Sequence, residues 1–251
     1  MRSLLSAVGH FLLALMAAAT PVACNTGNTL PLSKVPVTLS FKAATSPSSG
    51  GQDRATLSIT DGNHNVVQIA TVELVLRTLS FKRAYDDSAK DHVEMEPFLV
   101  CLPLDATKPV IASVVSLPAG SWDEVELEVY NRREAPIDTG FLQTTDFPDG
   151  VSVRVTGTWT SAGRHPVPFT FTTDLNEKQQ IMFDLPIVAV HDTVNNETFI
   201  VDLNRWFRDA RGVLVDPRSA NTGGRNENLV KDNIRASITG FEDDNRDGIK
   251  D

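Results

Sequence analysis

The sequence predicts a mostly β protein, an immunoglobulin- or transthyretin-like antiparallel β-sandwich with a C-terminal helix. Three observations predict it. Short stretches alternate apolar and polar residues, clusters of Gly, Pro, Ser, Asn and Asp separate them, and no helical stretches alternate with them. Short strands joined by turns are typical of sandwiches and barrels, whereas a βαβ fold needs a helix between successive strands.

The first strands show the alternation clearly. Residues 35–43 (VPVTLSFKA) and 55–60 (ATLSIT) both have a period of two, and the Ser-, Gly- and Pro-rich stretch 45–53 between them predicts a loop. A turn at 61–63 leads into 66–82, which is either two strands or one long bent strand. The remaining expected strands are 98–104, 110–117, 124–130, 151–159, 167–173, 180–190 and 197–203.

Two tryptophans accompany these strands. Trp122 follows a Pro-Ala-Gly turn at 118–120, and Trp159 ends an expected strand. We interpret both as core or rim aromatics. Stacking on a sugar is the alternative, and it requires an exposed ring beside a groove.

The last fifth of the chain changes character. Residues 204–208 (NRWFR) predict one helical turn that brings Trp206 and Phe207 into the core. From Asn226, a possible N-cap, the spacing predicts a helix that Gly240 loosens at its end. The apolar stripe of that helix consists of Val230, Ile234, Ser237, Ile238 and Phe241.

The N-terminus predicts export. Arg2 precedes an apolar run over 4–19, which has the length of a signal-peptide core and is too short for a comfortable membrane span. Residues 1–23 are therefore expected to be a signal peptide. Thr-Pro-Val-Ala before Cys24 resembles the lipobox of bacterial lipoproteins, although Pro21 stands where Leu is usual.

Lipidation of Cys24 would anchor the mature protein, with residues 24–34 as a polar tether. Ordinary signal-peptidase cleavage is the alternative. The chain has two cysteines. If Cys24 carries lipid, Cys101 is expected to be buried in the apolar run 98–104, because free Cys behaves as a small hydrophobe. A Cys24–Cys101 disulfide is the other possibility.

The composition excludes one class of partner. Charged residues make up 22% and hydrophobic residues 41% of the chain, which is ordinary for a globular protein. The net charge is −9, and no Lys/Arg cluster is longer than Arg132-Arg133. Because nucleic-acid binding needs a basic face, we expect no nucleic-acid partner.

The acidic tail has the pattern of a calcium loop. From Asp243 it follows D-x-N-x-D-G-x-x-D, the first nine positions of an EF-hand-like loop. Oxygens at positions one, three and five converge on a cation, Gly at six permits the turn, and position seven offers its carbonyl. The predicted calcium ligands are Asp243, Asn245, Asp247, Ile249 and Asp251.

This loop lacks the bidentate Glu that normally closes the shell at position twelve. Truncated loops of this kind occur in dockerin and thrombospondin type 3 repeats. Asp202, Asp209 or Asp216 could complete the shell; otherwise calcium should bind weakly, roughly at 10⁻⁴–10⁻³ M. A solvated acidic tail is the alternative interpretation.

Catalytic motifs are absent. The sequence contains no G-x-S-x-G, H-E-x-x-H, G-x-x-x-x-G-K or G-x-G-x-x-G. His64, His92, His165 and His191 have no metal-ligand spacing. We therefore expect no catalytic residues and no enzyme, with a carbohydrate-active enzyme as the third hypothesis because paired carboxylates cannot be recognised from sequence.

Three segments carry a resemblance. The stretches 72–81 (VELVLRTLSF), 98–104 (FLVCLPL) and 117–129 (LPAGSWDEVELEV) are similar to a domain of unknown function common in bacterial and archaeal surface lipoproteins. The resemblance covers 35–200 and implies a secreted immunoglobulin- or transthyretin-like sandwich without assigned catalytic residues. It does not extend to the C-terminal helix and acidic loop.

Together these patterns predict a signal peptide (1–23), a tether (24–34), a β-sandwich (35–203) and a C-terminal extension (204–251). The expected function is a non-enzymatic binding or structural role in the bacterial cell envelope, or as a secreted protein, with a glycan or protein as ligand. A calcium-stabilised interaction module is the second hypothesis.

Overall fold

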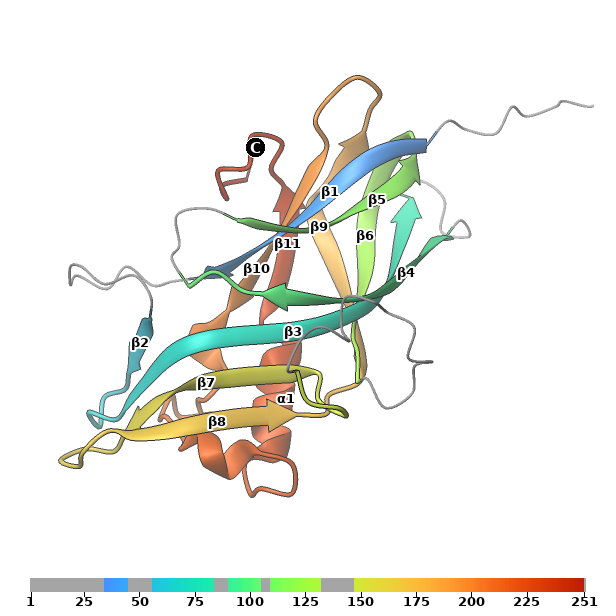
Figure 1. Ribbon diagram of the computed structural model, residues 1–251. Helices are drawn as coiled ribbons and strands as arrows, with labels where there is room; N and C mark the ends of the chain where they lie inside the picture. Colours follow the sequence, from blue (N-terminus) through green and yellow to red (C-terminus); the bar gives the residue numbers. More distant parts are fainter. Residues whose placement is uncertain (1–33, 45–55, 84–89, 105–108, 132–146, 251) are drawn as a thin grey trace, which may run out of the picture. The chain divides into compact units, whose positions relative to one another are not determined.

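A computed structural model describes residues 34–44, 56–83, 90–104, 109–131 and 147–250, without the side chains of 78, 79 and 90–96 (Figure 1). All the described residues belong to one compact unit. The predicted signal peptide and Cys24 lie outside the described residues. No helix in the described part of the chain is long and apolar enough to cross a membrane.

Two sheets form a β-sandwich, which confirms the predicted fold class. The four-stranded sheet has the order β11 (Ile238–Glu242), β10 (Asn196–Asp202), β1 (Lys34–Ala44), β5 (Val110–Pro118). The seven-stranded sheet has the order β8 (Val167–Thr173), β7 (Val153–Thr160), β3 (Val66–Arg83), β6 (Gly120–Val129), β9 (Glu177–Ala189), and β2 (Leu57–Thr60) and β4 (Lys90–Cys101) also pair with β3. The pairs are antiparallel except β1–β10, which is parallel.

Strand β3 is the centre of the larger sheet. It is one long bent strand, one of the two forms that its sequence allows. Its first half pairs with β2 and β7 and its second half with β4 and β6, with register shifts between Ile69 and Thr71 and between Leu76 and Leu79. Such irregularities bend a strand, so one strand can serve two sets of neighbours.

Aromatic side chains fill the space between the sheets. Phe41 and Phe199 stack with ring centroids 4.9 Å apart, and Phe171 meets Phe207 edge-on at 5.3 Å. Trp206 and Phe207 are fully buried directly after the short helix η3 (Leu203–Arg205), as the sequence predicted. Trp206 Nε1 donates to Ser237 Oγ at 2.8 Å, so the buried indole nitrogen is satisfied.

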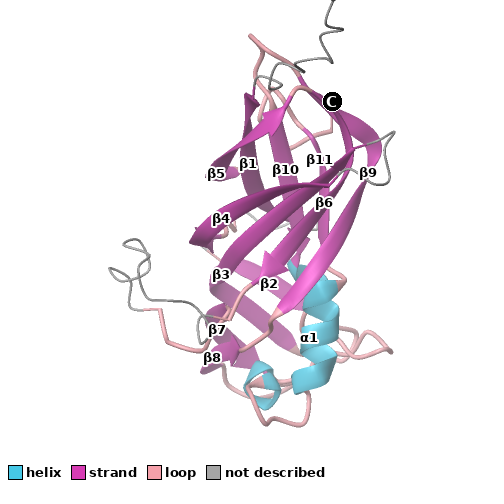
Figure 2. Cartoon of the chain, turned by 90° about the vertical axis from the view of Figure 1, so that its right-hand side faces the viewer, coloured by secondary structure: helices cyan, strands magenta, loops and turns pink. Residues whose placement is uncertain are grey.

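The predicted C-terminal helix is shorter than expected. Helix α1 (Glu227–Arg235) buries Val230 and Ile234, but the chain then forms β11 instead of continuing the helix. The prediction was wrong for Ser237, Ile238 and Phe241. Asn226 precedes the helix without a side-chain cap hydrogen bond, so the predicted cap is also wrong. Figure 2 shows α1 at the end of the sandwich that carries β7 and β8.

Packing explains why residues 238–242 form the strand β11 and do not continue helix α1. Gly240 lies opposite Phe199 in the register with β10, and a Cβ at Gly240 would lie 3.0 Å from Phe183 and 3.1 Å from Phe199. Two aromatic rings therefore occupy the space that a side chain would fill. Pairing with β10 satisfies the backbone of 238–242, and this tertiary contact overrides the helical spacing.

Cys101 is exposed, so its expected burial is wrong. Val100 and Leu102 are buried, and alternation along the end of β4 turns Cys101 outward, opposite Glu73 on β3. Partial burial, followed by the charge of Glu73, raises the pKa of the thiol. The alternative pairing with Cys24 involves a residue outside the described part.

Candidate calcium site

The segment after β11 folds back across the outer face of the four-stranded sheet. The Lys42 ammonium donates to the Gly248 carbonyl at 2.9 Å, and Arg246 Nη2 donates to Thr38 Oγ1 at 3.3 Å. Thr38 and Lys42 both lie on β1, where they alternate with core-facing residues. The C-terminal loop, residues 243–250, is therefore attached to β1 as well as to its own strand.

This loop covers polar side chains that an outer sheet face would normally expose. Ser40, Asn196 and Thr198 are fully buried. Ser40 Oγ donates to Asn196 Oδ1 at 2.7 Å, and Asn196 Nδ2 donates to Thr198 Oγ1 at 3.1 Å and to the Asp243 carbonyl at 2.8 Å. Buried polar groups must be hydrogen-bonded. Here the backbone carbonyl of Asp243 in the loop accepts the last hydrogen bond of their network.

The carboxylate of Asp243 is the centre of the loop. It is fully buried. Its Oδ2 accepts from Thr198 Oγ1 at 2.7 Å and from the Gly248 N–H at 2.9 Å, and its Oδ1 accepts from the Asp247 N–H at 3.0 Å. One side chain thus joins the strand β10 to the turn formed by the loop.

The backbone curls as the sequence pattern requires. The Asn245 side chain accepts from the Asp247 N–H at 2.9 Å, and the Asp247 side chain accepts from the Ile249 N–H at 2.8 Å. Arg246 and Gly248 have φ values of 58° and 76°. The predicted sharp turn at Gly248 is confirmed, since a left-handed conformation favours glycine.

The predicted ligands differ in their surroundings. Asp243 is buried, whereas Asn245, Asp247 and Ile249 are exposed, and Asp251 lies outside the described residues. Across the described ranges, no three His, Cys, Asp or Glu side chains gather as a metal site. The calcium pattern also uses an amide and a backbone carbonyl, so only two of its predicted ligands among the described residues are acids, Asp243 and Asp247.

The acids suggested to complete the shell have other partners. Asp202 accepts from the Asn204 N–H at 3.1 Å and caps η3. Asp209 pairs with Arg211 and Asp216 pairs with Arg218, each holding a local turn. The suggestion that any of them completes the loop is not supported by these contacts.

Sequence reasoning missed a buried acid close to the loop. Glu197 is 2% exposed, and its Oε2 has no hydrogen-bond partner among the described residues. Burial raises the pKa of this carboxyl well above its usual range, and the charges of Glu242, Asp244 and Asp243 add to the effect. Alternation along β10 places Glu197 on the core-facing side of the sheet together with Phe199, whereas Thr198 lies on the other side. The same alternation in the sequence could have identified Glu197 as a buried acid.

The tryptophans and histidines do not form a second site of the predicted kinds. Trp122 is fully buried and Trp159 is 8% exposed, which confirms the core interpretation and counts against sugar stacking on either ring. His64, His165 and His191 are exposed, while the side chain of His92 is not described.

Comparisons with known proteins assign no family. No family model matches the chain, and no curated protein matches it. Among solved structures, it is similar to MbnP from Methylosinus trichosporium. The identity is 11%, the match covers 70% of this chain and 79% of that chain, and the TM-score is 0.40. A likeness of this size carries no argument about function.

Proposed function

We propose that the protein is an exported β-sandwich, anchored to the bacterial cell envelope through Cys24, with a non-enzymatic structural or binding role. In this proposal the C-terminal loop binds Ca²⁺ weakly through Asp243, Asn245, Asp247, the Ile249 carbonyl and Asp251. The cation then holds the end of the chain on the four-stranded sheet.

One observation carries the calcium proposal. The buried Asp243 carboxylate fixes the first position of the loop on β10, and the curled backbone keeps the following oxygen side chains at alternate positions. A site whose ligands are already ordered loses less conformational entropy on binding a cation. We expect an affinity at the weak end of calcium sites, roughly 10⁻⁴–10⁻³ M.

Thermal unfolding of the mature chain with and without calcium tests this proposal. A ligand that binds only the folded state stabilises it by RT ln(1 + [L]/Kd), about 1.4–2.7 kcal/mol at 10 mM calcium for these affinities. For a chain of this size, the Tm should rise by about 3–11 °C relative to EDTA. Magnesium at the same concentration should have a smaller effect.

Two variants make the test specific. Asp247→Ala removes an exposed predicted ligand whose carboxylate accepts a hydrogen bond from the nearby Ile249 N–H, so the protein should fold and lose the calcium-dependent rise. Asp232→Ala removes the same charge from an exposed position on α1 and should keep the rise. An unchanged Tm in wild type at 10 mM calcium would exclude the calcium proposal.

The anchor has its own test. Cys24→Ala should move the protein from the membrane fraction to the soluble fraction, because one acyl-modified residue provides the proposed attachment. Cys101→Ala is the matched control and should leave the distribution unchanged. Equal distribution of wild type and Cys24→Ala would show that the lipobox interpretation is wrong and leave the secreted alternative.

A further inference from the structure

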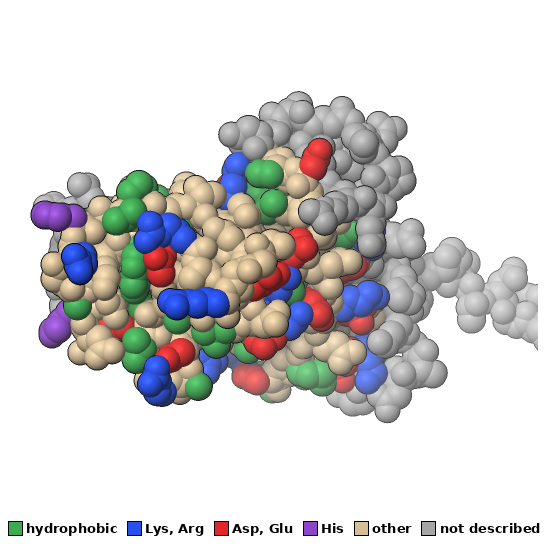
Figure 3. All heavy atoms as spheres, turned by 90° about the horizontal axis from the view of Figure 1, so that it is seen from below, with side chains coloured by type: hydrophobic (Ala, Val, Ile, Leu, Met, Phe, Trp, Pro, Cys, Tyr) green, Lys and Arg blue, Asp and Glu red, His purple; other side chains and the backbone are tan. Residues whose placement is uncertain are grey.

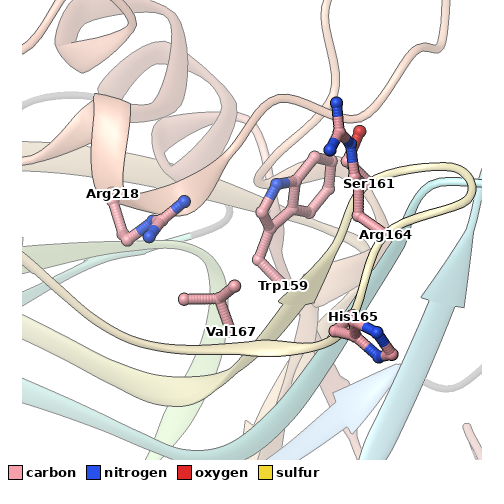
Figure 4. A pocket seen from close by; sticks show the side chains of 6 residues that line it. All are labelled: Trp159, Ser161, Arg164, His165, Val167 and Arg218. Atoms are coloured by element: carbon pink, nitrogen blue, oxygen red, sulfur yellow. The ribbon is translucent and has the colours of Figure 1, made fainter.

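A pocket opens beside the β7–β8 hairpin, away from the C-terminal loop. Its volume is about 340 Å³. The hairpin and the short helix η4 (Pro217–Ala220) provide its walls. Figure 4 shows the residues that line it: Trp159, Ser161, Arg164, His165, Val167 and Arg218.

The indole of Trp159 contributes its nitrogen-bearing edge to this pocket. The side chain is 8% exposed. Its Nε1 makes no hydrogen bond to any described residue and is not fully buried, so a ligand can reach it. In Figure 4 the nitrogen-bearing edge of the indole faces Arg218. The ring therefore offers a polar N–H donor, which differs from the stacking platform of a neutral-sugar site.

Two guanidinium groups stand on opposite sides of that indole (Figure 4). Arg218 uses Nε and Nη2 to bind Asp216, at 3.0 and 2.6 Å, which leaves its Nη1 for other partners. Arg164 is exposed, and within the described ranges its side chain has neither an ion pair nor a hydrogen bond. Arg218 is thus held in place by its own carboxylate, while Arg164 keeps all its donors.

The surroundings are basic in an acidic protein. Residues 204–225 contain five arginines and two aspartates, a net charge of +3, although the whole chain carries −9. Both aspartates, Asp209 and Asp216, are paired with arginines. Figure 3 shows the lower face of the molecule, where Lys and Arg side chains are interspersed with acidic ones and His side chains lie at one end. A local positive potential attracts anions even when the net charge is negative.

The side chains that line the pocket are suited to binding an oxyanion. It provides guanidinium, indole and hydroxyl donors from several directions and includes no carboxylate. Arginine binds phosphate and related oxyanions through multiple charge-assisted hydrogen bonds, and a tetrahedral group accepts from several directions at once. The volume is at the lower end of the range for small-molecule pockets, about 300–1,000 Å³.

We propose that this pocket binds the phosphate or sulfate monoester of a small polar molecule about the size of one sugar ring. Arg164 and Arg218 hold the ester oxygens, the Trp159 N–H and Ser161 hydroxyl donate to the anion or to its ring hydroxyls, and Val167 contacts the apolar side of the ring. This site is independent of the calcium loop.

Titration of the ¹⁵N-labelled mature protein with glucose 6-phosphate, glucose 6-sulfate and glucose tests the proposal. The indole N–H of Trp159 and the amides of 161–167 should shift saturably with the esters, with a Kd in the range of roughly 10⁻⁴–10⁻² M. Inorganic phosphate should bind more weakly than glucose 6-phosphate because it lacks the ring. Equal shifts with uncharged glucose, or no saturable shift with either ester at 50 mM, would overturn it.

A pair of charge-matched variants separates the pocket from general attraction. Arg164→Gln should weaken ester binding by roughly tenfold or more, since it removes charge-assisted hydrogen bonds, and its exposed position should leave folding intact. Arg205→Gln removes the same charge from an exposed arginine of η3 outside the pocket and should change the Kd by less than twofold. Equal weakening by both variants, or none by Arg164→Gln, would refute the proposal.

Discussion

Replacing Asp243 with alanine should destabilise the protein strongly even when no calcium is present. The substitution removes three hydrogen bonds to one buried carboxylate, from Thr198 Oγ1 and from the N–H groups of Asp247 and Gly248. Each hydrogen bond to a charged group contributes about 1.5–3 kcal/mol. Because the three share one acceptor, their loss is less than additive, and we expect a cost of about 3–5 kcal/mol.

Urea unfolding in EDTA, followed by circular dichroism, measures this cost without any contribution from calcium. The corresponding fall in Tm is about 6–20 °C for a chain of this size. Asp247→Ala is the control, because its side chain is exposed and, among the described residues, accepts only from the Ile249 N–H. It should cost less than about 1 kcal/mol. A cost below about 1 kcal/mol for Asp243→Ala would show that the loop does not depend on this carboxylate.

Three further changes test other parts of the structure. Gly157→Ala should destabilise the sheet by several kcal/mol, roughly the cost of overpacking, because its Cβ would lie 2.0 Å from the Gln68 carbonyl oxygen. Trp206→Phe should cost about 1–3 kcal/mol, since it removes the buried hydrogen bond to Ser237 Oγ. The stability of wild type should fall as the pH rises above about 4.5, because the pKa of Glu197 is raised in the folded state. Glu197→Gln should make this fall smaller. A raised folded-state pKa means that the folded state binds more protons than the unfolded state in that range.

Each of these changes has a clear contrary outcome. Gly62→Ala is the control for Gly157→Ala. A Cβ at Gly62 has no atom within 4 Å, so this change should be nearly neutral. If both substitutions changed the free energy of unfolding equally, the steric argument for Gly157 would be refuted. A neutral Trp206→Phe would show that the indole nitrogen is solvated in solution. Parallel stability–pH curves for wild type and Glu197→Gln, measured by urea unfolding between pH 4 and 8, would show that Glu197 does not titrate abnormally.

The strands could be predicted from the sequence because their signal is local. The alternation of residues such as Val35, Val37 and Leu39 places apolar side chains on one face regardless of which strand lies beside them. The partner of each strand could not be predicted, since the parallel pairing of β1 with β10 joins residues 158 positions apart, such as Thr38 and Asn196. The stretch 238–242 was misassigned for the same reason: its helical spacing is local, whereas its packing against Phe199 is not.

The candidate calcium site, like the strands, could be predicted from the sequence only in its local features. The positions of Asp243, Asn245, Asp247 and Gly248 define the loop, and its turn was predicted correctly from their spacing. Its location on the outer face of β1 and β10 depends on polar residues that are distant in sequence, such as Ser40, and that carry no motif. The pocket at Trp159 was also missed, because Arg164 and Arg218 come from segments more than 50 residues apart.

Calcium binding by the C-terminal loop is tested most simply by a calorimetric titration of the mature protein with calcium chloride, repeated with Asp247→Ala. We predict one saturable site per chain with a Kd of roughly 10⁻⁴–10⁻³ M in wild type and at least tenfold weaker binding in the variant. Absence of saturable heat in wild type, or identical isotherms for the two proteins, would contradict it.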